Sequence, residues 1–405
     1  MRGFRSNTNF IGLLGCLFVV TLGYGVLLPV LPFFLEQIAE NTTNTDNISF
    51  HFGILTAIYP VTLVILAPFW GRISDRIGHK ALMLIGLSGF IFMQAMIAFS
   101  ATLTMLYIAR IIGSVFSSFL VPVVSATLSD ITTEKKRTMA MAWAGTAISA
   151  GVIVGPGISG VLVENDLHFW LQSFHLSFQR FSVPFVFLAI VGFVAFTGVL
   201  VFIENVKPKV KNIPVKITFF PPGKWKLFKE LLLLTLILQL GITAFESVIT
   251  LSLKSTEGFS ASFIGLSLLT CGLVMAVLQP VVAKWGKLLI ANPYQQIAFG
   301  LLIAGLAFPI FNFIHTKWLL LASIGLFSIG TSFVVPNLLS LISLKEPNAS
   351  GWAFGMQASF GGIGQIAGPL IGTGLFAVNN NAPFYTAGAL FVTTSIIEFG
   401  KYNKR

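Results

Sequence analysis

Charged residues are scarce in this chain. Only 10% of its 405 residues are Asp, Glu, Lys or Arg, whereas 55% are hydrophobic. A water-soluble fold would have to hide far more apolar surface than its core needs. The scarcity of charge therefore argues against a soluble protein and predicts a chain that crosses a membrane many times.

Cysteine, histidine and phosphate-binding patterns are also sparse. The two cysteines, Cys16 and Cys271, lie inside apolar runs and offer neither a disulfide framework nor metal-ligand spacing. The five histidines form no cluster of the kind that a membrane-embedded enzyme would need, and no P-loop is present for ATP. We therefore expect no enzymatic activity, no cofactor and no metal.

The net charge of +11 would suggest nucleic-acid binding on a soluble module. Here, however, the basic residues lie in short gaps between apolar runs. If the N-terminus is cytosolic, all but four of the 25 Lys and Arg fall in cytosolic segments, the four being Arg110, Arg180, Lys254 and Lys317. This asymmetry predicts a multi-pass plasma-membrane protein with both termini in the cytosol, surrounded by lipid and not bound to nucleic acid.

Apolar blocks of roughly 20 residues, enough to cross a bilayer, recur along the whole chain. The expected spans are 10–35, 52–70, 81–100, 103–129, 139–163, one ending near 203, 231–253, 261–283, 294–314, 318–344, 351–378 and 384–399. We therefore expect an all-α polytopic membrane protein with twelve transmembrane helices in two pseudo-symmetric six-helix halves. These halves are residues 1–203 and 231–405, joined by a cytosolic linker at 204–230 that is rich in Lys and Pro.

An internal repeat supports two related halves. Ser118-Phe-Leu-Val-Pro122 matches Ser332-Phe-Val-Val-Pro336 at an offset of 214, and Gly155-Pro156 matches Gly368-Pro369 at an offset of 213. Repeated halves with interrupted helices are typical of transporters that work by alternating access.

The segment 164–182 precedes the sixth span. Its Leu and Phe residues recur at helical spacing, which predicts a helix lying in the outer membrane interface. His168 and His175 could share a face of that helix, but no further ligand accompanies them, so we do not expect a metal site.

The stretch from Gly71 to Lys80 carries four fixed charges and a histidine between two apolar runs, which predicts a loop. Gly71 and Gly78 would allow a tight turn, and Asp75 could meet a helix N-terminus and a neighbouring arginine.

This stretch, with Gly71, Asp75, Arg76, Gly78 and Lys80 in place, resembles the signature loop of the major facilitator superfamily. The usual form has Leu, Ala and Arg where this chain has Ile73, Ser74 and His79. The resemblance implies a cytosolic latch; a simple cluster of cytosolic charge remains the alternative.

The fifth expected span contains Gly151, Gly155, Pro156, Gly157 and Gly160, and this pattern resembles the antiporter signature of exporting members of the superfamily. Small residues four apart let helices approach closely, and Pro156 removes one backbone hydrogen bond. A generic helix contact is the alternative reading.

Two charged residues stand inside expected spans. Arg110, in Tyr107-Ile-Ala-Arg-Ile-Ile-Gly113, resembles a third signature of the family, and Glu246 is the only acid well inside a span. Both lie about seven residues, or about 10 Å, below the outer end. Such residues are costly in lipid and usually functional or paired. We expect both to face a central cavity and to take part in proton coupling. Glu246 would take up a proton and release it, or exchange it for a cationic substrate; a static ion pair between helices is the alternative.

The stretches Gly25-Val-Leu-Leu-Pro-Val-Leu-Pro32 and Ala244-Phe-Glu246-Ser are similar to those of bacterial quinolone and multidrug efflux pumps, in the drug:proton antiporter branch. Those pumps place a second acid in span 10, where Ser332 stands here. The resemblance implies a monomeric exporter of drugs or amphipathic small molecules, coupled to protons, in a bacterial cytoplasmic (inner) membrane. An exporter of one endogenous metabolite, such as a siderophore or lipid-like compound, is the alternative.

Amide side chains within spans tend to face the interior of the helix bundle. The polar candidates for the substrate cavity are therefore Gln239, Asn337, Gln357 and Gln365.

Overall fold

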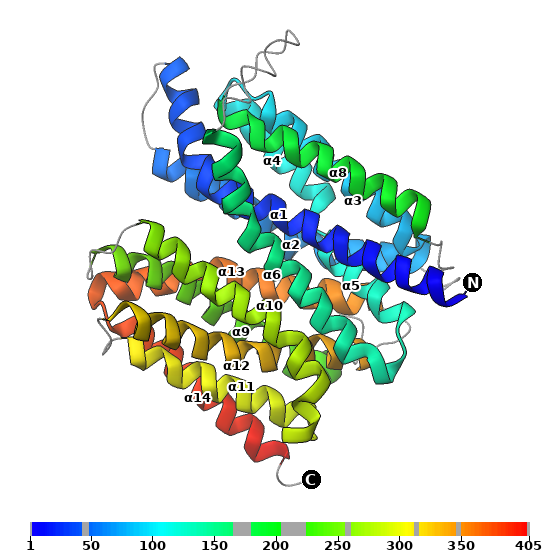
Figure 1. Ribbon diagram of the computed structural model, residues 1–405, viewed down its shortest axis with the longest axis vertical. Helices are drawn as coiled ribbons and strands as arrows, with labels where there is room; N and C mark the ends of the chain where they lie inside the picture. Colours follow the sequence, from blue (N-terminus) through cyan, green and yellow to red (C-terminus); the bar gives the residue numbers. More distant parts are fainter. Residues whose placement is uncertain are drawn as a thin grey trace. The chain divides into compact units, whose positions relative to one another are not determined.

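The computed structural model describes residues 2–42, 48–164, 180–203, 224–255, 261–311, 316–345 and 350–402 (Figure 1). All regular elements in these ranges are helices, which confirms the expected all-α fold. Most of the expected linker and of the segment 164–182, including His168 and His175, lies outside the described residues. The division of the chain at 204–230 therefore stays a prediction.

The described residues form the following helices, in chain order. They are α1 (Arg2–Thr42), α2 (Ile48–Ile77), α3 (His79–Ala98), α4 (Leu103–Ser117), α5 (Leu120–Ile131), α6 (Glu134–Glu164), the 3₁₀ turn η1 (Arg180–Ser182), α8 (Val183–Phe202), α9 (Lys224–Ser255), α10 (Ala261–Leu289), α11 (Pro293–Ile310), α12 (Lys317–Lys345), α13 (Ser350–Val378) and α14 (Ala382–Tyr402). Because backbone groups cannot bond to water in a bilayer, helices satisfy them internally.

In the described residues, the α-helices number twelve when α4 and α5 are counted as one. Within the described part of the chain, eleven helical segments are long and apolar enough to cross a membrane. The twelfth helix, α14, contains threonines, a serine and Glu398, which lower its mean hydropathy. This arrangement confirms the expectation of a polytopic helical membrane protein.

The break between α4 and α5 divides a single expected span. Ser118 and Phe119 form a turn, and Pro122 lies in the first turn of α5, where its missing N–H is tolerated. The repeat-related Pro336 lies inside α12, which continues without interruption. The same sequence motif is thus a break in one repeat and a continuous helix in the other.

The chain divides into two units, each of which packs mainly against itself. Unit 1 comprises Met1–Leu128, Ala150–Ile217 and Asn348–Gly355, and unit 2 comprises Ser129–Ser149, Thr218–Pro347 and Met356–Arg405. The helices α6 and α13 each contribute residues to both units.

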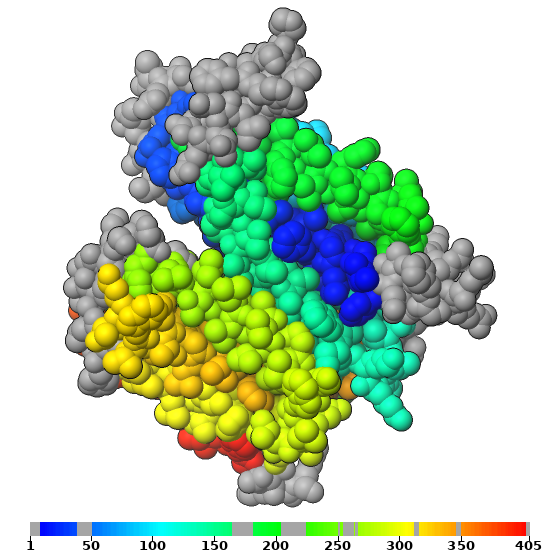
Figure 2. Space-filling view, in the orientation of Figure 1, coloured from blue at the N-terminus to red at the C-terminus, as the bar shows by residue number. Residues whose placement is uncertain are grey.

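In unit 1, α3 packs closely against α4 and α8. The approach depends on glycine, because a Cβ on Gly89 would lie 2.3 Å from the Cβ of Phe116. In unit 2, α11 packs against α12 and α14, and Figure 2 shows their surfaces, coloured from yellow to red. These cores hold the helices that carry the candidate site.

Candidate functional site

The charged stretch at Gly71–Lys80 is helical and not a loop. Helix α2 continues to Ile77, and α3 begins at His79, so that Gly78 alone forms the turn, with a φ of 95°. Only a residue without a Cβ adopts this left-handed conformation readily. The expectation of a loop was wrong because the charges lie at the end of a long helix. Gly71 lies inside this helix and packs against the backbone of α13; it does not form a turn.

One side of α2 meets the first turns of α13 within unit 1. Along this side lie Ala67, Gly71 and Asp75, each four residues after the one before. A Cβ on Gly71 would lie 2.1 Å from the carbonyl oxygen of Gly351, and a Cβ on Gly355 would lie 2.4 Å from that of Ala67. The two backbones therefore touch directly. Any larger residue at these positions would force them apart.

Asp75 uses this close approach to bind the start of α13. Its Oδ1 accepts a hydrogen bond from the Gly351 N–H at 2.9 Å, and its Oδ2 accepts one from the Trp352 N–H at 3.0 Å. A carboxylate at a helix N-terminus is favoured by the unpaired N–H groups and by the helix dipole. The expected contact of Asp75 with a helix N-terminus is present in the structure; its role as a latch stays a prediction.

The neighbours of Asp75 have partners as well. Lys80 donates to the Leu200 carbonyl oxygen at 2.8 Å, and Arg72 and Arg76 also interact with other groups. Ser74 and His79, two positions that depart from the usual family pattern, are both buried and hydrogen-bond to each other through Oγ and Nδ1. The two departures are therefore structurally coupled.

The glycines of the α6 signature divide into two groups. Gly151 and Gly155 are buried against α1, where a Cβ would lie 2.2 Å from the Thr21 Oγ1 and 2.5 Å from the Gly25 carbonyl carbon, respectively. Pro156, Gly157 and Gly160 are exposed. The first part of the pattern thus builds a helix crossing, and the second part remains accessible on the described surface.

The repeat-related glycines of α13 make the matching crossing with α9 in unit 2. A Cβ on Gly364 would lie 2.8 Å from the Leu236 carbonyl oxygen, and one on Gly368 would lie 2.2 Å from the Thr243 Oγ1. Thr243 also donates to the Gly364 carbonyl at 3.2 Å. Both repeats therefore use the same small-residue packing.

Arg110 is buried in unit 1. Its Nε and Nη2 donate to the Leu55 carbonyl oxygen at 3.2 and 3.0 Å, and its Nη1 lies 3.8 Å from the sulfur of Met93. Only 4% of the residue is exposed. A positive charge held this deeply by one carbonyl group is costly, which favours a functional role.

Glu246 lies on α9 in unit 2, and its side chain is exposed. The preceding residue, Phe245, is buried with its ring 4.4 Å from that of Phe327 and 5.3 Å from that of Phe311. This aromatic cluster fixes the turn of α9 from which Glu246 projects. Because Arg110 and Glu246 belong to different units, their shared cavity and their pairing stay predictions.

The four polar cavity candidates differ in burial. Asn337 is buried, and its Nδ2 donates to the Gln296 Oε1 and the Phe333 carbonyl oxygen, both at 2.8 Å. This placement favours a role in joining α11 to α12. Gln239, Gln357 and Gln365 are half-buried and keep part of their surface accessible.

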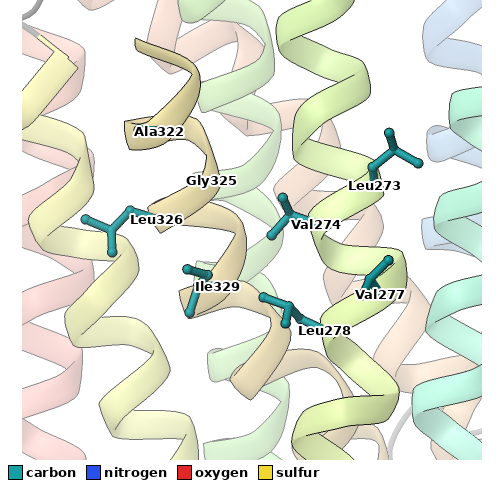
Figure 3. A pocket seen from close by; sticks show the side chains of 8 residues that line it. All are labelled: Leu273, Val274, Val277, Leu278, Ala322, Gly325, Leu326 and Ile329. Carbon is teal, nitrogen blue, oxygen red and sulfur yellow. The ribbon is translucent and has the colours of Figure 1, made fainter. Parts of the chain in front are cut away.

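A groove of about 540 Å³ lies between α10 and α12 of unit 2 (Figure 3). Its lining is aliphatic, formed by Leu273, Val274, Val277, Leu278, Ala322, Gly325, Leu326 and Ile329. Such a surface suits acyl chains or the apolar part of an amphipathic molecule, and it offers no polar anchor.

One buried acid was missed by the sequence reasoning. Glu398, near the end of α14, is only 4% exposed and accepts from the Lys401 Nζ at 2.6 Å; the same ammonium lies 2.9 Å from an oxygen of Glu230. The acid three residues before a lysine in the last helical turns was the available signal. The cluster ties α14 to α9.

Among the described residues, no group of three or more His, Cys, Asp or Glu could hold a metal ion.

Comparison with known proteins shows similarity along almost the entire chain. Residues 13–369 match the family model described as Major Facilitator Superfamily. Multidrug resistance protein 1 of Bacillus subtilis (strain 168) is 30% identical over 95% of this chain and 93% of its own length. Quinolone resistance protein NorA of Staphylococcus aureus is 26% identical over 92% of this chain and 90% of its own. The crystal structure of the human organic anion transporter MFSD10 (TETRAN) matches with a TM-score of 0.80 and 19% identity, over 97% of this chain and 99% of that one.

Proposed function

The chain belongs to the major facilitator superfamily of small-molecule transporters, and on this premise we propose that it is a proton-coupled exporter of drugs or amphipathic small molecules. It would work as an antiporter by alternating access in a bacterial cytoplasmic membrane, with both termini in the cytosol. The names of the relatives from Bacillus subtilis and Staphylococcus aureus support drug export, and so does the α6 signature.

Glu246 is the observation that carries the proposal. An acid that projects from a membrane-spanning helix is costly unless it serves a purpose, and a carboxylate can bind and release one proton. The turn of α9 that carries Glu246 is held in place by the Phe245 cluster. Uptake of a proton when the site is desolvated, and its release when the site is hydrated, would couple the two states.

The crossings of α6 on α1 and of α13 on α9 support alternating access. Each is a close backbone contact made by repeat-related glycines, and such interfaces let helices slide or rock without side chains interlocking. The Asp75 contact with α13 would act as the cytosolic latch of this cycle.

Arg110 favours the second candidate, a dedicated exporter of an endogenous metabolite. Its guanidinium is buried and bonded to one carbonyl oxygen, so that an anionic group of a metabolite would be a suitable partner. The coupling machinery would be the same, and only the substrate would differ.

Transport into inverted membrane vesicles tests both candidates. A pH gradient, acidic inside, should drive accumulation of one or more compounds from a panel of quinolones and cationic dyes. Glu246→Gln should reduce this accumulation to that of vesicles without the protein, while the protein remains folded. Glu134→Gln makes the same chemical change at an exposed first turn of α6 and should transport normally.

The outcomes separate the proposals. Unchanged accumulation in Glu246→Gln would refute the assigned role of this acid. No accumulation of any drug, together with accumulation of a cell metabolite, would replace drug export by the second candidate.

A further inference from the structure

Two buried triplets of hydroxyl residues occupy matching positions in the two repeats. Ser114 and Ser117 of α4, with Ser118 directly after it, correspond, at the repeat offset of 214, to Ser328, Thr331 and Ser332 of α12. All six residues are at most 1% exposed. Residues at positions i, i+3 and i+4 share one face of a helix, so that each triplet forms one polar patch.

In α12 the three hydroxyl groups bond to the helix itself. Ser328 donates to the Ile324 carbonyl oxygen at 2.8 Å, while Thr331 and Ser332 donate to the Ser328 carbonyl oxygen at 3.0 and 2.7 Å. Such bonds to preceding carbonyl groups are the common way in which hydroxyl groups are satisfied inside a helix. The α12 triplet therefore has no need of a further partner.

The three hydroxyl groups at the end of α4 lack such bonds. None of the hydroxyl oxygens of Ser114, Ser117 and Ser118 has a hydrogen-bond partner among the residues that the structure describes. The patch ends at the α4–α5 break, where Pro122 cannot donate to the carbonyl of Ser118. Buried polar atoms without protein partners in a native fold usually bind ordered water.

Arg110 extends this patch by one turn. It lies four residues before Ser114, on the same face of α4, and is equally buried. Arg110 and the three serines thus form a continuous polar row through an apolar unit. The corresponding residue in α12 is Ile324, so that the second repeat has no such row.

We propose that Ser114, Ser117 and Ser118 hold a chain of bound water that conducts a proton along α4 between the level of Arg110 and the α4–α5 break. Each hydroxyl oxygen accepts a proton from the water on one side and releases its own proton to the water on the other. No group in the row gains a lasting charge, and one proton leaves for each that enters. The conduction step rests on the proposed proton coupling, whereas the binding of water does not.

Radiolytic hydroxyl-radical footprinting in ¹⁸O-labelled water tests the binding of water directly, because buried side chains are labelled only where water is bound beside them. Phe119 and Phe327 are matched reporters, since each is 0% exposed and adjoins one triplet. We expect Phe119 to be labelled at least about tenfold faster than Phe327. The combined variant Ser114→Ala, Ser117→Ala and Ser118→Ala should reduce labelling of Phe119 to the rate of Phe327. Equally slow labelling of both rings in the unaltered protein would overturn the proposal.

Proton flux tests the conduction step. In vesicles, substrate-driven proton movement should fall by about tenfold or more in the α4 triple variant, whereas the control variant Ser328→Ala, Thr331→Val and Ser332→Ala should stay within about twofold of the unaltered protein. Equal fluxes in the unaltered protein and the α4 variant would overturn the relay. If the unaltered protein moves no protons at all, the proposed function fails, and the footprinting still decides whether water is bound. The α4 triple variant should stay folded, because the hydroxyl groups that it removes have no hydrogen-bond partner among the described residues.

Discussion

Gly71→Ala is the sharpest test of the contact between α2 and α13. The added Cβ would lie 2.1 Å from the Gly351 carbonyl oxygen, whereas ordinary contact begins at 3.4 Å. The two backbones would therefore have to part by roughly 1 Å. The Asp75 oxygens, now 2.9 and 3.0 Å from the Gly351 and Trp352 nitrogens, would then lie beyond hydrogen-bonding range.

The expected loss follows from these contacts. A hydrogen bond to a charged group contributes about 1.5–3 kcal/mol, and overpacking costs about 1–3 kcal/mol. Alanine is better than glycine inside a helix by about 0.5–1 kcal/mol, and the structure relaxes in part. We therefore expect Gly71→Ala to lower the free energy of unfolding by about 2–3 kcal/mol.

The two free cysteines provide the assay. Cys16 and Cys271 are both buried, so a fluorogenic thiol dye reacts with them only as the purified protein unfolds. Gly71→Ala should lower the melting temperature by several degrees. Gly53→Ala is the matched control on the same helix, because a Cβ there meets nothing within 4 Å. If both variants melt at the same temperature, the close approach of α2 and α13 is not as the structure shows it.

Two further substitutions test the latch and the aromatic cluster. Asp75→Asn should slow transport without shifting its pH dependence, since it weakens the bonds to α13 but carries no transported proton; a shift in the pH profile measured in vesicles would contradict this. Phe245→Ala should lower the free energy of unfolding by about 3–5 kcal/mol, because it empties a site that is 1% exposed and surrounded by other rings. The thiol-dye assay measures this loss, and Phe193→Ala, at a ring that is 59% exposed, should leave the melting temperature nearly unchanged.

Local patterns in the sequence were sufficient to predict the helices, the close glycine contacts and the contact of Asp75 with a helix N-terminus. Long apolar runs have few alternatives to a helix in a bilayer, and small residues four apart favour a close approach of two helices. The prediction of a loop at Gly71–Lys80 is wrong because charged residues do not by themselves indicate irregular structure. A helix can carry charges as soon as it leaves the apolar layer.

Other features depend on contacts that no local pattern contains. Asn337 resembles a cavity residue by composition, but its partner Gln296 lies on another helix and is identified only by the fold. The assignment of the first turn of α13 to unit 1 depends equally on packing between distant segments. The break at Ser118 has the same sequence motif as the continuous helix at Ser332, so that the surroundings must decide which form occurs.

The two repeats agree in packing and differ in chemistry. Gly151 meets the backbone of Phe18 and Leu22, and Gly364 meets that of Leu236 and Leu240, so that α1 and α9 correspond at an offset of 218. By this correspondence Glu246 matches Leu28, just as Arg110 matches Ile324 at the offset of 214. Each charged residue therefore has an aliphatic counterpart in the other repeat. The glycine contacts that pack the helices occur in both repeats, because both repeats have the same packing. Proton binding needs a charged or titratable side chain, and at each of these positions such a side chain is present in one repeat only. Glu246, to which we assign proton coupling, and Arg110, at whose level the proposed water chain begins, are accordingly both positions where the repeats differ.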